Sequence, residues 1–257
     1  MFSKLITMSA LATTSANAAW VESKVGDMTV WSNAPAKYDK VVILLHGGGG
    51  SPEGWKGVYD YSNGDSTKTD SKDGKDGKNT GFSLGDTSKT KYVVPASTMS
   101  GGVWYTSTKK DGCTASDDCA YDLATISTSG DQIKAVIDNE KKLGSYTDST
   151  KIYLGGYSQG SQMASYVQLN KMKEALGGVI LFNGWPLPPT PKLADKTTAE
   201  AQAVATYYGS DMRWMAMYGA HDPIFPGEES KKVLDKTMEK LGASKTIKIS
   251  VVEDVGH

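Results

Sequence analysis

The sequence has little of what several classes of protein require. Its 28 lysines and arginines balance 29 aspartates and glutamates, which leaves a formal net charge of −1. Without a basic or an acidic excess, neither nucleic-acid binding nor electrostatic attachment to an anionic membrane is indicated. No apolar run reaches the roughly 18 residues that a membrane-spanning helix needs, so no stable membrane insertion is expected.

Cysteine and histidine are scarce as well. The two cysteines, Cys113 and Cys119, are spaced for a local disulfide in a secreted protein, and in a cytosolic protein they would be free thiols. No second pair of cysteines or histidines lies nearby, and the aspartates within 65–79 do not have EF-hand spacing. We therefore expect no metal site and no cofactor.

The N-terminus has the pattern of a secretory signal peptide. Lys4 provides a short positive region, residues 5–16 are weakly apolar, and the Ala-Asn-Ala sequence at 16–18 fits the cleavage rule. We expect residues 1–18 to be removed and the protein to be secreted or to enter an endomembrane lumen. The alternative is a cytoplasmic protein with a loosely packed N-terminal tail. No N-x-S/T sequon is present that would support secretion independently.

The remaining residues, 19–257, suffice for one domain with a substantial core. Short apolar, β-branched runs alternate with amphipathic segments, which is typical of an α/β domain with a mostly parallel sheet. The expected strands lie within 20–31, 41–45, 92–95, 152–154, 178–182, 214–218 and 246–252, and the expected helices are 126–143, 159–172 and 233–241. The polar stretch at about 62–85 is expected to be a solvated loop insertion.

A strand, a sharp turn and a helix are predicted around Ser158. The sequence Gly-Tyr-Ser-Gln-Gly at 156–160 matches the G-x-S-x-G nucleophile elbow. The two glycines fit a turn so tight that a Cβ at either flank would crowd the backbone. The following helix would direct its N-terminal N–H groups at the space beside the serine. The pattern alone is weak, because a surface serine in an ordinary strand-to-helix turn would give the same sequence.

A serine nucleophile needs a base, because a free hydroxyl is a poor nucleophile. Of the three histidines, His46 belongs to a glycine-rich loop, where it is better placed to support the turn. In the order serine, acid, histidine that is typical of α/β-hydrolases, Ser158, Asp222 and His257 each follow a predicted strand. Asp222 would orient the imidazole of His257. Glu253 and Asp254, in the same loop as His257, are alternative candidates for the acid.

The glycine-rich loop at 46–50 directly follows the predicted strand 41–45. Such a loop can bring backbone N–H groups against a reacting oxygen, and its form resembles the HGGG-type oxyanion loop of esterases. A merely flexible turn is the alternative. A phosphate-binding loop is not indicated, because neither a G-K-[ST] sequence nor a G-x-G-x-x-G pattern follows.

The ordered set of these motifs resembles the phospholipase/carboxylesterase family, whose best-known members are the acyl-protein thioesterases. The similar segments begin at about residue 39 and include L-H-G at 45–47, G-W at 54–55, G-G-Y-S-Q-G at 155–160, W-P-L-P at 185–188, D-P-I-F-P at 222–226 and G-H at 256–257. The resemblance implies an α/β-hydrolase fold with Ser158 as nucleophile, His257 as base and Asp222 as its acid partner. It also implies that the backbone N–H groups of Gly48 and Gln159 form the oxyanion hole.

These residues predict a serine hydrolase that cleaves carboxylic esters or thioesters, of the carboxylesterase, lysophospholipase or acyl-thioesterase type. The expected partner is a small-molecule or lipid ester, and the oligomeric state is left open. Five apolar residues are candidates for pocket walls, with core positions as the alternative: Trp55, Val103, Trp104, Trp185 and Phe225. A serine peptidase of the same fold and a catalytically impaired ester-binding protein are the alternative functions.

Two departures from the family pattern affect these expectations. The family usually continues past its histidine with a C-terminal helix, whereas this sequence stops at His257. Either the sequence is truncated, or a terminal carboxylate lies on the base's own residue, where it would favour the imidazolium form. An exported protein would also meet few cytosolic acyl-proteins, so small esters, lysolipids or polymer-bound esters are the expected substrates.

Overall fold

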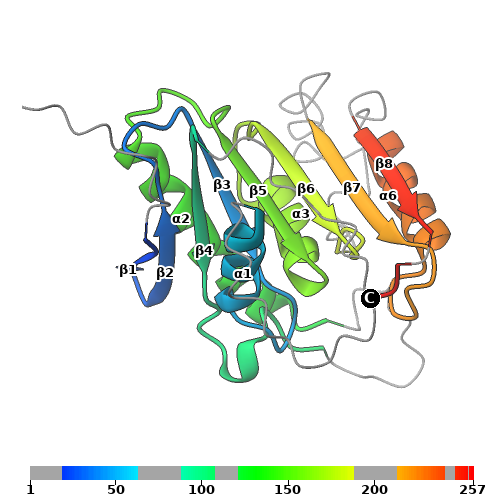
Figure 1. Cartoon of the computed structure of the whole chain (residues 1–257). Helices are drawn as coiled ribbons and strands as arrows, with labels where there is room; N and C mark the ends of the chain where they lie inside the picture. The colour runs from blue at the N-terminus through cyan, green and yellow to red at the C-terminus, as the bar shows by residue number, and fades with distance from the viewer. Residues whose placement is uncertain (1–18, 63–87, 108–120, 188–212, 241–246, 254) are drawn as a thin grey trace, which may run out of the picture.

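The computed structural model describes residues 19–62, 88–107, 121–187, 213–240, 247–253 and 255–257. Three predicted features lie outside the described residues: the signal peptide, the pair Cys113 and Cys119, and the insertion at 62–85 apart from its first residue. The described strands form one sheet of eight strands in the order β1-β2-β4-β3-β5-β6-β7-β8 (Figure 1).

The strands are β1 (Val21–Val25), β2 (Met28–Asn33), β3 (Lys40–Leu45), β4 (Thr90–Pro95), β5 (Ile152–Tyr157), β6 (Gly178–Phe182), β7 (Trp214–Gly219) and β8 (Ile247–Val252). The helices are α1 (Pro52–Ser62), α2 (Leu123–Leu143), α3 (Gln159–Asn170) and α6 (Gly227–Lys240), with a short 3₁₀ turn at Ser100–Gly102. β1 and β2 form a hairpin, and β2 pairs antiparallel with β4. The pairings from β4 to β8 are parallel, so the predicted α/β fold with a mostly parallel sheet is confirmed.

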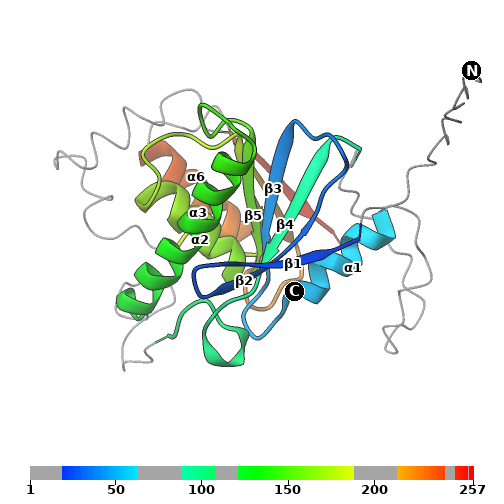
Figure 2. The same ribbon diagram turned by 90° about the vertical axis from the view of Figure 1, so that its left-hand side faces the viewer.

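Helices cover both faces of the sheet. The helices α2, α3 and α6 lie on one face, and α1 lies on the other (Figure 2). The strand β3 shows how the sequence produces these layers, because successive side chains of a strand point to opposite faces. Val41, Ile43 and Leu45 belong to the large core that includes buried residues of α2 and α3. Leu44, between them, packs in a smaller cluster with Tyr59 of α1.

The helix α1 was not among the predicted elements, although its sequence carries signals for it. Pro52 is its first residue, a position where the missing N–H of proline costs nothing. Glu53 lies in its first turn, where a carboxylate complements the helix dipole. Trp55, Val58 and Tyr59 then follow at helical spacing. The helix matters for the site because it begins directly after the glycine-rich loop.

The order of the strands brings this loop and the serine turn together. From β3 the chain moves to β4 on one side, and it then returns through α2 to β5 on the other side of β3. Ligands of open α/β sheets bind beyond the carboxyl ends of the strands at such a reversal. Leu45 at the end of β3 pairs with Gly156 near the end of β5, so the loops that follow both strands emerge side by side.

Candidate active site

Ser158 occupies the sharp turn between β5 and α3. Its backbone has φ 53° and ψ −120°, a conformation that is sterically costly for a residue with a side chain. Its N–H donates to Phe182 O across 2.8 Å, which ties the turn to the end of β6. This is the strained turn that the G-x-S-x-G pattern predicts.

Two glycines allow α3 to begin directly against the ends of the strands. A Cβ at Gly156 would overlap the backbone of Gly160, and a Cβ at Gly160 would overlap the carbonyl groups of Leu45 and His46. No side chain could move aside to relieve either overlap, because the obstructing atoms belong to the backbone. The close packing directs the first N–H groups of α3 toward the space beside Ser158.

A continuous chain of hydrogen bonds joins Ser158, His257 and Asp222. His257 Nε2 lies 3.0 Å from Ser158 Oγ, and His257 Nδ1 lies 2.8 Å from Asp222 Oδ2. Because a carboxylate only accepts hydrogen bonds, Nδ1 carries the imidazole proton, and Nε2 is left to accept the proton of the serine hydroxyl. The three side chains therefore have the geometry of a nucleophile, a general base and an orienting acid.

The loop after β7 fixes the carboxylate of Asp222. Its Oδ1 accepts hydrogen bonds from the N–H groups of Ile224 and Phe225, each across 2.8 Å, and the side chain is buried. Oδ2 is thereby left for His257. The rings of Tyr157 and Phe225 pack against the imidazole, with their centroids 5.1 and 5.6 Å from its own. The imidazole is thus held by an acid at one nitrogen and by aromatic contacts at its ring.

The glycine-rich loop after β3 lies against the start of α3. Gly49, at φ 76°, donates its N–H to Gly102 O across 3.0 Å. A Cβ at Gly48 would come within 3.1 Å of the Gln159 side chain, so these two residues are in contact. Within the described part of the chain, neither the N–H of Gly48 nor that of Gln159 donates to an acceptor. Both amides are available to a reacting oxygen.

The side chain of Gln159 fastens a third segment to the serine turn. Its Oε1 accepts from the N–H of Trp104 across 2.7 Å, and its Nε2 donates to Tyr105 O across 3.0 Å. The sequence predicts a role only for the backbone N–H of Gln159, in the oxyanion hole. It does not reveal the role of the side chain, because Trp104 and Tyr105 are distant in the sequence. The amide side chain fixes the position of the first residue of α3 relative to the loop that follows β4.

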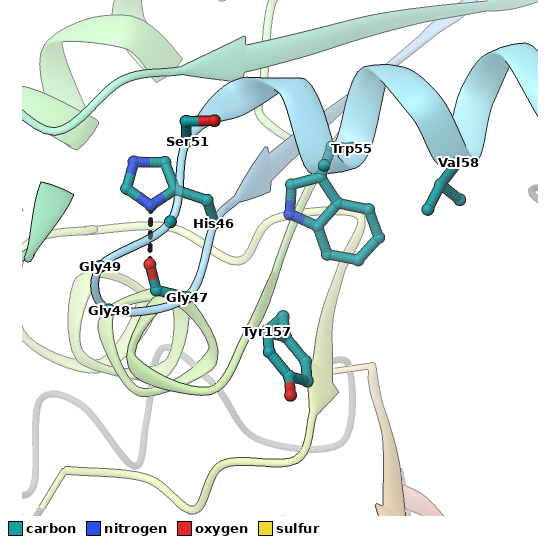
Figure 3. A pocket seen from close by; sticks show the side chains of 10 residues that line it. His46, Gly47, Gly48, Gly49, Ser51, Trp55, Val58 and Tyr157 are labelled. Carbon is teal, nitrogen blue, oxygen red and sulfur yellow. Dashed lines mark hydrogen bonds between the residues drawn. The ribbon is translucent and has the colours of Figure 1, made fainter. Parts of the chain in front are cut away.

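His46 supports the glycine-rich loop, as the sequence predicts. Its Nδ1 donates to Gly47 O across 2.8 Å (Figure 3), and its Nε2 accepts from the N–H of Ser97 across 3.2 Å. Its ring lies 4.7 Å from the ring of Trp104, whose Nε1 donates to His46 O across 2.7 Å. Burial lowers the pKa of His46, against the opposing effect of the hydrogen bond to Gly47. The neutral imidazole therefore acts as a structural link between two loops.

The lowered pKa of His46 predicts a loss of stability in mild acid. An unfolded histidine titrates near pH 6.5, whereas this one stays neutral to lower pH in the folded protein. The unfolded chain therefore binds more protons below pH 6.5, and the free energy of unfolding decreases as the pH falls from 6.5 to the lowered pKa. Urea unfolding at a series of pH values should show that the free energy of unfolding falls less at acidic pH in His46→Gln than in the wild type. Equal losses would contradict this role.

A cavity of about 590 Å³ opens beside the glycine-rich loop (Figure 3). Its lining residues come from the loop, from α1 and from the end of β5, and they are His46, Gly47, Gly48, Gly49, Gly50, Ser51, Gly54, Trp55, Val58 and Tyr157. The lining is mostly apolar, and none of these side chains is a charged lysine, arginine, aspartate or glutamate. A Cβ at Gly47 would lie 3.5 Å from Ser158 Cβ, which places the cavity next to the serine.

Of the five predicted pocket walls, Trp55 lines this cavity. Its Nε1 donates to Leu45 O across 2.9 Å, and its ring lies 5.7 Å from the ring of Phe182, so its orientation is fixed from two sides. Val58 and Tyr157 also line the cavity but were not predicted to do so. The position of Val58 follows once α1 is recognised, because it lies one turn beyond Trp55 on the same face.

The other predicted walls lie elsewhere. Trp104 does not line this cavity, because it is 0% exposed and belongs to the main core. Trp185 and Phe225 are buried against each other, with ring centroids 5.0 Å apart, and Phe225 contacts His257 instead of the cavity. Val103 is partly buried outside the lining. An apolar segment can enter either a core or a pocket, and long-range packing decides between them.

The described residues offer neither a metal site nor a membrane-spanning helix. Among them, no group of three or more histidine, cysteine, aspartate or glutamate side chains is arranged to hold a metal ion. The helices in these same segments also include none with both the length and the apolar character needed to cross a bilayer.

Several solved structures are similar to this one. A carboxylesterase from Mesorhizobium loti matches with a TM-score of 0.64 at 13% identity, over 93% of this chain and 91% of that chain. The esterase PE8 matches with a TM-score of 0.61 at 17% identity, over 88% and 89% of the two chains. Acyl-protein thioesterase 2 from Zea mays matches with a TM-score of 0.59 at 15% identity, over 89% and 90%. At these identities the similarity shows the α/β-hydrolase fold.

The sequence comparisons add the family. No curated protein sequence matches this chain significantly. The family model described as phospholipase/carboxylesterase matches residues 81–257, a segment that covers well over half of the chain and includes Ser158, Asp222 and His257. The glycine-rich loop precedes this segment and joins it through the pairing of β3 with β5. The resemblance drawn from the sequence motifs is confirmed, and the chain belongs to the phospholipase/carboxylesterase family, a family of esterase- and thioesterase-type hydrolases.

Proposed function

We propose that this protein is a serine hydrolase that cleaves carboxylic esters or thioesters through an acyl-enzyme intermediate on Ser158. The observation that carries the proposal is the chain of hydrogen bonds from Ser158 Oγ to His257 Nε2, at 3.0 Å, and from His257 Nδ1 to Asp222, at 2.8 Å. Membership of a phospholipase/carboxylesterase family supports the same reaction class.

In the first half-reaction, His257 Nε2 takes the hydroxyl proton as Ser158 Oγ bonds to the carbonyl carbon of the substrate. The carbonyl oxygen becomes an oxyanion, which accepts hydrogen bonds from the N–H groups of Gly48 and Gln159. The bond to the leaving alcohol or thiol then breaks, and the leaving group takes the proton from His257. Asp222 stabilises the imidazolium between these two proton transfers.

In the second half-reaction, a water molecule takes the place of the leaving group. His257 accepts a proton from the water as the water oxygen attacks the acyl carbon, and the same two amides hold the second oxyanion. Ser158 Oγ then leaves with that proton, which releases the carboxylic acid and restores the enzyme. In enzymes of this kind, loss of one oxyanion donor costs about 2.7–4 kcal/mol in the transition state.

We propose the cavity beside the glycine-rich loop as the site of the acyl group. It adjoins Ser158 through Gly47, and Trp55 and Tyr157 are among its lining residues. None of the described residues that line the cavity carries a charged side chain, which favours a neutral acyl group, because a charged one would lose hydration without gaining a partner among them. The N-terminal sequence pattern leads us to propose export as well, which favours small, lysolipid or polymer-bound esters over cytosolic acyl-proteins.

A panel of p-nitrophenyl esters with neutral acyl chains of increasing length tests the proposal. We expect saturable release of p-nitrophenol and, under conditions of slow deacylation, a mass increase equal to the acyl group on the peptide that contains Ser158. A series of peptide p-nitroanilides in parallel covers the peptidase alternative. Ester binding without release would indicate an impaired ester-binding protein, and an acyl adduct on a different residue would contradict the role of Ser158.

A further inference from the structure

We propose that Asn183 is a positioning residue that holds the loops of Asp222 and His257 together. The proposal rests on the roles given to these two residues in the proposed function. Asn183 directly follows β6 and is 8% exposed, and its N–H donates to Met217 O of β7 across 3.0 Å. Its φ is 46°, in the left-handed region that asparagine adopts more readily than most residues with a side chain.

The side-chain amide of Asn183 uses both of its polar groups. Its Oδ1 accepts from the N–H of Gly219 across 2.8 Å, and its Nδ2 donates to Gly256 O across 2.9 Å. Gly219 ends β7 and begins the loop that carries Asp222, and Gly256 is the neighbour of His257 in the sequence. One buried side chain therefore links the loop of the acid to the loop of the base.

The acid and the base are held in different ways. The carboxylate of Asp222 accepts two N–H groups of its own loop. The base is held through its two predecessors, because Val255 O accepts from the acid loop and Gly256 O accepts from Asn183. Asn183 therefore acts on the position of the imidazole through the residue that directly precedes His257.

Removal of this amide would act on the geometry of the reaction. The buried N–H of Gly219 would lose its acceptor, which leaves a buried donor unsatisfied, and the more exposed Gly256 O would lose the donor that positions it. The imidazole must reach Ser158 and Asp222 at the same time, at 3.0 and 2.8 Å. A displacement of about 1 Å at a reacting group can lower a rate by about 100-fold.

Two substitutions test the proposal. Asn183→Gly tolerates the positive φ and removes both hydrogen bonds, whereas Asn183→Asp keeps the acceptor and places a second oxygen against Gly256 O. We expect both to lower kcat for p-nitrophenyl acetate by about 100-fold with little change in KM, because neither alters the lining of the cavity. Asn170→Asp is the matched control. Asn170 donates to Tyr166 O at the far end of α3, and its variant should keep the wild-type kcat.

Proton NMR gives a readout that does not depend on turnover. The proton on His257 Nδ1, which bonds to Asp222, should give a downfield resonance in the wild type and in Asn170→Asp. It should broaden through faster exchange in the folded Asn183 variants. Circular dichroism shows which of the two Asn183 variants are folded, and a single folded variant is enough to test the proposal. Unchanged kcat with an unchanged resonance would overturn the proposal. An inactive wild type whose resonance is still lost on substitution of Asn183 would refute the proposed function and retain the positioning role.

Discussion

Alanine at position 158 is expected to remove nearly all ester turnover. Without the hydroxyl no acyl-enzyme can form, and the amides of Gly48 and Gln159 can polarise a carbonyl but cannot attack it. Loss of the nucleophile from a serine triad lowers kcat by about 10⁶-fold. The residual rate enhancement then comes from substrate binding and from the oxyanion hole. The fold should persist. The substitution removes the hydroxyl that bonds to His257, but it keeps the backbone N–H of residue 158, whose hydrogen bond to Phe182 O holds the turn.

Ser165→Ala is the matched control for this prediction. Ser165 lies in α3, the helix that follows Ser158, is buried, and donates its hydroxyl to Gln162 O across 2.7 Å. Its replacement removes the same atom from a site away from the reacting centre, so kcat for p-nitrophenyl acetate should stay at the wild-type value. If Ser158→Ala retained wild-type turnover, the nucleophile would have to lie elsewhere and the acyl-enzyme on Ser158 would be excluded.

The serine turn could be predicted from the sequence because its G-x-S-x-G signature is a local pattern. Gly156 is required by contact with the backbone of Gly160, which is close in the sequence, although Gly160 itself is required by contact with the distant Leu45 and His46. The flanking strands could be predicted for a related reason. The strands β3 and β6 lie inside a parallel sheet with helices on its faces, so their sequences are continuous apolar runs that stand out from the rest of the chain.

The parts that the sequence does not reveal depend on contacts between distant segments. The sequence places Asn183 after a strand, but its two partners lie at the end of β7 and after β8, and they become its neighbours through the sheet order. The same holds for Trp104, whose apolar segment suits a pocket as well as a core. Its buried position is fixed by its bond to His46 O and by the Gln159 side chain. Local propensity carries no information about either arrangement.

Asparagine in place of Asp222 is expected to lower kcat by about 10⁴-fold and to leave the fold intact. Its Oδ1 can still accept from the N–H groups of Ile224 and Phe225, so its NH₂ group turns toward His257. An NH₂ donor requires His257 Nδ1 to accept, which moves the imidazole proton to Nε2. In that tautomer Nε2 donates to Ser158 and cannot take the proton of its hydroxyl.

Steady-state kinetics with p-nitrophenyl acetate should show this loss in kcat with little change in KM, because Asp222 is 2% exposed and lies outside the lining of the cavity. Asp138→Asn removes a carboxylate from a surface ion pair with Lys134 and should keep the wild-type kcat. If Asp222→Asn loses less than about tenfold, the orienting acid lies elsewhere, and Glu253→Gln becomes the variant to measure. A large loss confined to Asp222 would mean that the loop after β7 orients the base, so that the reactivity of Ser158 depends on three strand ends brought together by the sheet.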